Sequence, residues 1–169
     1  SFYRPGALDP AKMTPSHRDY VARLIAVHGE ARTAAILGRE TFNNLIYPNI
    51  SINTRFQQFR VIQPIAVDRT RVHSYCFRLK GAPEEMFRAA VRFVSTNNSA
   101  ASPISSDDFA IFEDTQRGLN DGSMEWVDFS RGAGAERPFG KSGVTSVGTH
   151  ELPMRTQMAA WARYMSGAE

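Results

Sequence analysis

The hydrophobic positions near the start of the chain follow a helical period. Thr14 and Pro15 form a favourable helix start, a capping hydroxyl followed by a proline in the first turn. Apolar residues then recur at helical spacing, at Tyr20, Val21, Leu24, Ile25 and Val27. Gly29 interrupts this pattern, and a second short helix is predicted over residues 30–37, ending at Gly38.

Between residues 45 and 79 the pattern changes to the alternation that is typical of β-strands. The segments are rich in β-branched and aromatic residues, and three strands are expected, over residues 45–53, 56–65 and 71–79. Residues 67–70 are predicted to connect the last two as a hairpin. In the third strand the more apolar face carries His73, Tyr75, Phe77 and Leu79.

The second half of the chain mixes helical and irregular patterns. Pro83 followed by two glutamates predicts a helix that continues to Val94. A polar stretch over 95–106 precedes a second helix, expected from Asp107 to Leu119. The remaining segments are predicted to be a short strand over 125–129, a glycine-rich loop over 131–148 and a last helix over 151–165.

This order of elements predicts an α+β fold. Consecutive strands joined by short turns favour an antiparallel sheet, and helices segregated from the strands favour a sheet covered by helices. The final helix is the natural candidate for that cover. A length of 169 residues favours a single domain with its own hydrophobic core.

Charge and composition exclude several classes of function. The net charge is +3, but the basic residues are scattered rather than clustered with aromatics, so nucleic-acid binding is not expected. No stretch is long and apolar enough to cross a bilayer, and no signal peptide opens the chain. With Cys76 as its one cysteine, the chain is expected to be cytoplasmic. Because it does not begin with methionine, we expect it to be either a processed product or a piece of a longer protein.

The four histidines do not form a recognisable metal motif. His17 and His28 can share a helical face, but about 16 Å along the helix axis separates them. Neither they nor His73 and His150 match a paired-histidine pattern, so each is interpreted as a histidine without a catalytic role. Cys76 lies within a predicted strand and is interpreted as a buried structural thiol.

The two adjacent carboxylates Asp107 and Asp108 have two interpretations. Two acidic residues at the start of a helix can serve as its N-cap and interact with the helix dipole. Alternatively, one of them points into a cavity and binds a metal, as the carboxylate does in a site of two histidines and one carboxylate.

In this context the sequence resembles the large subunits of Rieske non-haem iron aromatic ring-hydroxylating dioxygenases. The resemblance covers roughly residues 14–165 and depends on the order of several segments. These are the Pro-Asn strand at 45–52, the hairpin at 59–72, the helix opening at 80–85, Ser106-Asp107-Asp108 with Gln116-Arg117-Gly118-Leu119, and the closing helix with Thr149–Glu151, Pro153, Arg155 and Trp161.

The resemblance implies a fold and a set of site residues. The fold is a helix-grip, START-like catalytic domain, of which residues 1–169 would be the C-terminal part. Asp108, the second aspartate of the pair, matches the family's iron-binding carboxylate, with Asp107 the less favoured choice. Asn98, Ile104 and Gln63 fall at positions that line the substrate pocket. The paired histidines that complete the iron site, and the Cys-x-His and Cys-x2-His motifs of a Rieske domain, are absent from this sequence.

The resemblance also implies cofactors and partners. A mononuclear Fe(2+), with further ligands outside this chain, would catalyse the reaction of dioxygen with an aromatic substrate. An aromatic acid is one candidate for that substrate. Electrons would come from NAD(P)H through a separate reductase, often with a ferredoxin, and a [2Fe-2S] cluster in the missing Rieske domain. The family is expected to assemble as a trimer of large subunits, often with small (beta) subunits.

Two functions therefore stand as hypotheses. The first is a catalytic-domain segment of an aromatic ring-hydroxylating dioxygenase, an oxidoreductase, in which case the isolated chain is expected to bind iron poorly and to be inactive. The alternative is a non-catalytic helix-grip domain that binds a hydrophobic ligand or a partner, with no dependence on iron. The substrate's identity and the position of hydroxylation are not encoded in any recognisable motif.

Overall fold

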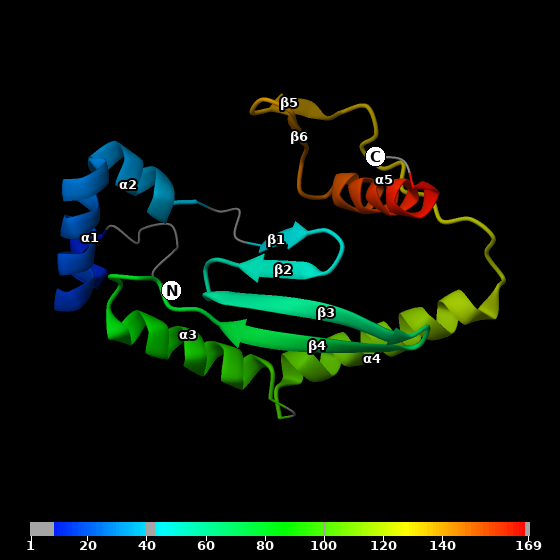
Figure 1. The fold of residues 1–169 in the computed structure, drawn as a ribbon, viewed down its shortest axis with the longest axis horizontal. Helices are drawn as coiled ribbons and strands as arrows, with labels where there is room; N and C mark the ends of the chain where they lie inside the picture. The colour runs from blue at the N-terminus through cyan, green and yellow to red at the C-terminus, as the bar shows by residue number, and fades with distance from the viewer. Residues whose placement is uncertain (1–8, 40–42, 100, 168–169) are drawn as a thin grey trace. The chain divides into compact units, whose positions relative to one another are not determined.

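The computed structural model describes residues 9–39, 43–99 and 101–167. The chain divides into two compact units, residues 1–114 and 115–169. Helices and antiparallel strands occur together, as Figure 1 shows, so the expected α+β class is confirmed. Among the described residues, no helix combines the length and the apolar character that crossing a bilayer requires.

The first unit begins with helices whose ends follow local sequence signals. After a short 3-10 turn, η1 (Pro10–Lys12), come α1 (Pro15–His28) and α2 (Glu30–Leu37). The Thr14 hydroxyl accepts a hydrogen bond from the backbone N–H of His17, which is the expected N-cap of α1. Gly29, with φ +77°, separates the two helices, a conformation that glycine adopts without steric cost. The predicted break and the predicted end at Gly38 are confirmed.

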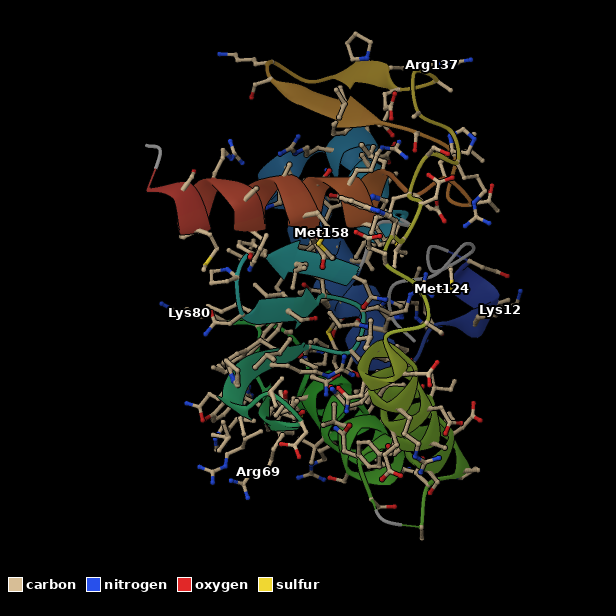
Figure 2. All side chains as sticks on the ribbon, turned by 90° about the vertical axis from the view of Figure 1, so that its right-hand side faces the viewer. Lys12, Arg69, Lys80, Met124, Arg137 and Met158 are labelled. Carbon is tan, nitrogen blue, oxygen red and sulfur yellow. The ribbon has the colours of Figure 1, made fainter. Side chains whose placement is uncertain are left out.

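A four-stranded antiparallel sheet follows, in the order β1-β2-β3-β4 (Figure 1). Its strands are β1 (Asn43–Ile46), β2 (Ile50–Asn53), β3 (Gln58–Ala66) and β4 (Arg69–Cys76). The expectation of three strands was wrong, because the first predicted segment folds back on itself and pairs Ile46 with Ile50. The connection between β3 and β4 is the predicted hairpin, and Arg69 lies at its outer end (Figure 2).

The helix α3 (Glu84–Asn97) runs beside the edge strand β4 and contributes much of the unit's core (Figure 1). Its buried side chains Met86, Ala90 and Val94 recur every four residues, as an amphipathic helix requires. Met86 packs with Tyr20 of α1 and with Ala82, and partly buried Leu24 and Leu79 flank this cluster. The rings of Phe56 and Phe93 stack with their centroids 3.6 Å apart.

The next helix, α4 (Pro103–Asp121), begins earlier and ends later than the sequence predicted. The expected start at Asp107 was wrong because the serine-rich segment before it is itself helical. Ser106 donates from its backbone N–H and its hydroxyl to the carbonyl of Ser102, each at 3.1 Å, which closes the first turn. At the other end the helix continues through Gly118 to Asp121, and Gly122, with φ +65°, follows it.

The second unit contains a small hairpin and the last helix. The strands β5 (Arg137–Phe139) and β6 (Gly143–Thr145) pair antiparallel inside the segment predicted to be a loop, so that prediction was wrong in part. The strand predicted over 125–129 is not formed. The predicted closing helix is confirmed as α5 (Leu152–Ser166). Its expected role as the cover of the sheet stays a prediction.

A network of polar contacts fixes the start of α5 within this unit. Arg155 donates from Nη1 to the carbonyls of Phe129 and Arg131, at 2.7 and 3.2 Å, and forms an ion pair with Glu136 through Nη2. Glu151 accepts a hydrogen bond from the backbone N–H of Arg131 at 3.1 Å and pairs with its guanidinium at 3.3 Å. The segment before the hairpin is therefore held to the first turn of the helix.

Candidate functional site

The position of Asp108 on α4 argues against its interpretation as a helix N-cap. Because the helix begins at Pro103, neither aspartate lies in the first turn, and the first turn contains no acidic residue. The N-cap role considered for the pair is therefore not available to Asp108. The helix-dipole effect is concentrated in the first turn, so it gives little reason for a carboxylate at this position.

Asp108 also lies within a stripe of large apolar side chains. Residues three and four positions apart are neighbours on a helix surface, so Ile104 and Ile111 flank Asp108 on one side and Phe112 flanks it on the other. These three apolar side chains are each more than half exposed. Asp107 has Ile104 and Ile111 as neighbours on one side only. On its other side lies Asp114, two helical turns further along. Asp108 is therefore a carboxylate with large apolar side chains on both sides of it.

Asn98 and Ile104 lie on either side of the corner between α3 and α4. Asn98 is the C-cap of α3 and donates its backbone N–H to the carbonyl of Val94 at 2.9 Å. The corner is closed by Ser105, a buried residue whose hydroxyl donates to the carbonyl of Asn97. Ile104, at 57% exposure, is on the surface of this corner, one turn before Asp108. The structure thus brings three of the four sequence-predicted site residues to one end of α4.

Gln63 lies apart from this corner, on β3. Its side chain is exposed, and its amide oxygen Oε1 lies 3.2 Å from Nε2 of His73 on the adjacent strand β4. The His73 ring is stacked loosely on Tyr75, with centroids 6.3 Å apart. Among the described residues, no hydrogen bond joins Gln63 to Asp108 or Asn98. His73 was interpreted from the sequence as a histidine without a catalytic role, although the alternation along 71–79 already placed it on the same face as Tyr75.

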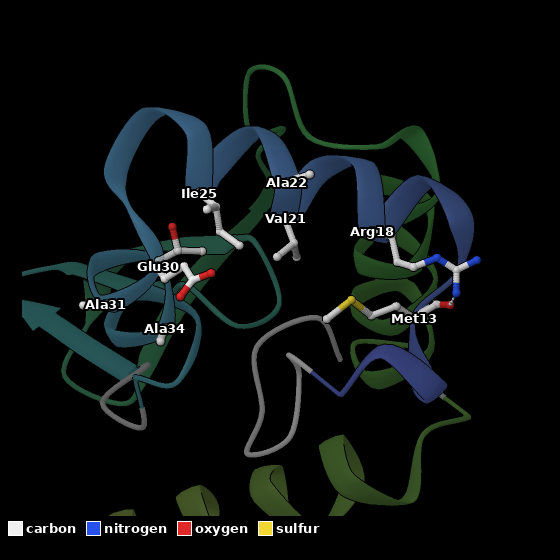
Figure 3. Close-up of a pocket in the computed structure, with 9 residues that line it drawn as sticks. Met13, Arg18, Val21, Ala22, Ile25, Glu30, Ala31 and Ala34 are labelled. Carbon is white, nitrogen blue, oxygen red and sulfur yellow. Dashed lines mark hydrogen bonds between the residues drawn. The ribbon is translucent and has the colours of Figure 1, made fainter.

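A separate open cavity of about 660 Å³ lies between α1 and α2 (Figure 3). Its walls are mainly apolar, and Arg18 closes one end by donating to the carbonyl of Met13 at 3.3 Å. None of the four predicted site residues lines it. The nine lining residues are Met13, Arg18, Val21, Ala22, Ile25, Glu30, Ala31, Thr33 and Ala34.

In the part of the chain that the structure describes, no three histidine, cysteine or acidic side chains converge in a group that could hold a metal ion. Asp108 can offer one carboxylate to an ion, which is one of the ligand types that iron accepts. The described residues therefore fit a single ligand position and do not make up a complete iron site.

The other titratable candidates have structural surroundings. His17 is buried, and this burial lowers the pKa of its imidazole, although the nearby Glu85 carboxylate opposes the shift. Cys76 is half-buried on β4, and burial raises the pKa of its thiol, which favours the unreactive protonated form. Cys76 was expected to be fully buried, and that expectation was wrong in degree because β4 leaves the thiol partly exposed.

Comparison with known proteins extends over nearly the whole chain. Residues 7–167 match the family model described as the ring hydroxylating alpha subunit (catalytic domain). The 2-halobenzoate 1,2-dioxygenase large subunit of Burkholderia cepacia is 36% identical over 106 residues, which are 62% of this chain and 23% of the relative.

Two further relatives carry related names. The toluate 1,2-dioxygenase subunit alpha of Pseudomonas putida is 34% identical over 114 residues, which are 66% of this chain and 24% of that relative. The anthranilate 1,2-dioxygenase large subunit of Acinetobacter baylyi is 29% identical over 119 residues, 70% of this chain and 25% of its own. The matched segments thus span about a quarter of each relative. The family resemblance inferred from the sequence is confirmed, and the chain belongs to the ring-hydroxylating alpha subunit family, to whose catalytic domain residues 7–167 correspond.

Proposed function

We propose that this chain forms part of the catalytic domain of an oxygenase that adds dioxygen-derived hydroxyl groups to an aromatic acid. The family match supports the reaction class. The three relatives are named for halobenzoate, toluate and anthranilate, each of which is a benzene ring that carries a carboxylate. Their shared chemistry supports an aromatic acid over an unsubstituted hydrocarbon as the substrate class.

The observation that carries the proposal is the position of Asp108 among Ile104, Ile111 and Phe112. A carboxylate in an apolar stripe is unfavourable once the stripe is covered, unless a cation or hydrogen-bond donors meet it there. In this family a mononuclear iron would be that cation. We therefore assign Asp108 as its carboxylate ligand, in preference to Asp107.

The chain's own residues would then have separate tasks. When bound, iron would supply the redox chemistry that activates dioxygen. Asp108 would hold one coordination position and add a negative charge that favours the oxidised states of the ion. Ile104 and its apolar neighbours on α4 would exclude water and offer a wall for an aromatic ring. Asn98, at the helix corner, and Gln63, on the sheet, are proposed as polar positions that line the pocket.

The remaining parts of the reaction would come from outside these residues. The proposal requires further iron ligands, a [2Fe-2S] Rieske cluster, and electrons from NAD(P)H delivered by a reductase, with or without a ferredoxin. Assembly as a trimer of large subunits, with or without small subunits, and a cytoplasmic location belong to the same proposal. Taken alone, residues 1–169 are expected to bind iron poorly and to turn over no substrate.

The test uses a holoenzyme whose large subunit carries this sequence as its matching segment. Asp108→Ala is expected to lower iron affinity by at least about tenfold and to abolish product formation, since it removes a direct ligand. Asp107→Ala is the matched control and is expected to retain iron. Metal analysis measures the first result, and incorporation of labelled dioxygen into the product measures the second. Full iron occupancy in Asp108→Ala would overturn the assignment.

The α1–α2 cavity favours a second candidate function. Its size and apolar walls suit a hydrophobic ligand, and it contains no metal-ligating cluster among the described residues. A domain that binds such a ligand without catalysis would do so equally well after iron is removed by a chelator. Binding that persists without iron, together with no oxygenated product from the iron-loaded holoenzyme, would favour this alternative over the oxygenase.

A further inference from the structure

The two faces of the four-stranded sheet differ in chemistry. The register places Ile46, Ile50, Val61 and His73 in one row across all four strands, and Ile52, Phe59 and Tyr75 in the next row. Side chains directly opposite each other across antiparallel strands share a face. The other face carries more polar residues, among them Ser51, Asn53, Gln58, Arg60 and Ser74, together with the apolar pair Ile62 and Val72 and with Leu45. The first face is therefore the apolar one, and it is called the aromatic face here.

The apolar part of this face is built on stacked rings. Phe59 and Tyr75 stack with centroids 4.8 Å apart and planes 15° from parallel. Val61 and His73 form the neighbouring cross-strand pair, and the His73 ring is 6.3 Å from that of Tyr75. Phe59 and Val61 are half-buried, whereas Tyr75 is 46% exposed. A flat aromatic ligand could extend this stack without disturbing the sheet.

One end of the aromatic face is polar and cationic. Gln63 and Arg71 are directly opposite each other in the next row, beyond Val61 and His73. Both side chains are exposed. Because the amide oxygen of Gln63 can only accept, the 3.2 Å contact places the donated proton on Nε2 of His73. This bond fixes the amide so that its NH2 group remains to donate, beside a guanidinium that is always charged.

We propose that the aromatic face of the sheet, at Phe59, Val61, Gln63, Arg71, His73 and Tyr75, binds the aromatic acid with its ring over Val61 and its carboxylate at Gln63 and Arg71. The inference rests on the proposed function and adds the subsite that selects acids. Residues two apart on a strand are about 6.7 Å apart, which suits one ring and its carboxylate. Charge complementarity favours this occupant over a neutral arene, because the apolar row ends at a cation and an amide donor. His73 is a positioning residue that acts through Gln63.

The test compares two ligands of the same shape in the holoenzyme whose large subunit carries this sequence. Benzoate and benzamide share the ring and differ in the charged group, so the ratio of their dissociation constants measures recognition of the carboxylate. Arg71→Met is expected to reduce the preference for benzoate about tenfold or more, the usual effect of losing a charge-assisted hydrogen bond. Arg60→Met, an identical change on the opposite face, is expected to leave the preference unchanged.

A second variant keeps the proposal testable if Arg71→Met does not fold. His73→Phe retains a ring to stack on Tyr75 but loses the hydrogen bond to Gln63, so the preference is expected to fall about threefold to tenfold. If His73 had a purely structural role, its replacement would weaken the binding of benzoate and benzamide equally. Unchanged preference in both variants, or an equal loss in Arg60→Met, would overturn the proposal. A holoenzyme that needs Asp108 and hydroxylates benzoate, with a preference over benzamide that both variants leave intact, would refute this subsite while the proposed function stands.

Discussion

The hydroxyl of Thr14 donates a hydrogen bond to the carboxylate of Glu85, which joins the N-cap of α1 to the first turn of α3 across 71 positions of sequence. The same hydroxyl accepts from the backbone N–H of His17 at 3.3 Å. One side chain thus caps a helix and connects it to its neighbour. Its partner Glu85 precedes Met86, which packs with Tyr20 and Ala82 in the core of the first unit.

We predict that Thr14→Val lowers the free energy of unfolding by about 1–2 kcal/mol. Valine keeps the shape of threonine but can neither accept the backbone proton nor donate to Glu85. Urea denaturation followed by circular dichroism measures the loss. Thr14→Ser keeps both hydrogen bonds and is expected to stay within about 0.5 kcal/mol of the parent. Equal stability of the valine and serine variants would show that the hydroxyl contributes nothing.

A second prediction concerns pH. Burial lowers the pKa of His17, so below about pH 6.5 the unfolded chain takes up a proton that the folded chain does not, and the free energy of unfolding falls. Hydrogen bonds from Ser16 and Thr14 lower the pKa of Glu85. Glu85 therefore stabilises the fold at pH values above the ordinary pKa of a glutamate. This stabilisation is lost as the pH falls through the lowered pKa of the folded state. Both groups destabilise the fold on acidification, His17 first.

Urea midpoints measured between pH 7.5 and pH 5 test this order. His17→Gln is expected to flatten the decline in this window, because glutamine does not titrate. His28→Gln, at the exposed end of the same helix, is expected to keep the decline of the parent. If His17→Gln and the parent lose stability in parallel, the decline must come from another group.

The fold could be predicted wherever a local signal determined it. Thr14 with Pro15, and Gly29, mark helix ends through capping and backbone conformation, which depend on neighbouring residues only. The strand expected over 125–129 has the β propensity of Trp126 and Val127, but a strand also needs a partner, and both side chains are largely exposed. The β5–β6 hairpin was missed because three-residue strands are too short to establish an alternation.

Candidate site residues could be named from the sequence, but their arrangement could not. Asp108 was proposed through the resemblance, whereas its place among Ile104, Ile111 and Phe112 depends on a helix that begins at Pro103. The serines at 102, 105 and 106 obscured that start, since serine usually favours caps and turns over helix interiors. The side-chain contact of Gln63 with His73 depends on strand register, which the hydrophobic pattern and the turn between β3 and β4 set together.

Gly118 leads to a third prediction. It lies inside α4, its φ is not positive, and an added Cβ would meet no atom within 4 Å. Gly118→Ala should therefore raise the free energy of unfolding by about 0.5–1 kcal/mol, since alanine loses less backbone entropy on forming a helix. Thermal unfolding measures the gain. Gly122→Ala, just after the helix at φ +65°, is the contrasting control and is expected to destabilise. A loss of stability in Gly118→Ala would mean that the glycine has a packing role.

The last prediction concerns Gly132 and His150 in the second unit. Gly132 has φ +75°, and a Cβ built on it would lie 2.2 Å from Cγ of His150. Gly132→Ala must therefore both strain the backbone and displace the imidazole, and we expect it to lower the free energy of unfolding by about 2–3 kcal/mol. Gly134→Ala, at φ +83° with open space around it, should cost only the backbone strain of about 1–2 kcal/mol.

A double-mutant cycle separates the two causes for Gly132. In a His150→Ala background the obstructing ring is gone, so Gly132→Ala should cost no more than Gly134→Ala does in the parent. Near-ultraviolet circular dichroism and urea denaturation of the four proteins in the cycle measure the coupling. If Gly132→Ala is as costly without the imidazole as with it, the backbone conformation alone requires glycine at this position. The contact with His150 would then contribute nothing to the order of the segment that precedes α5.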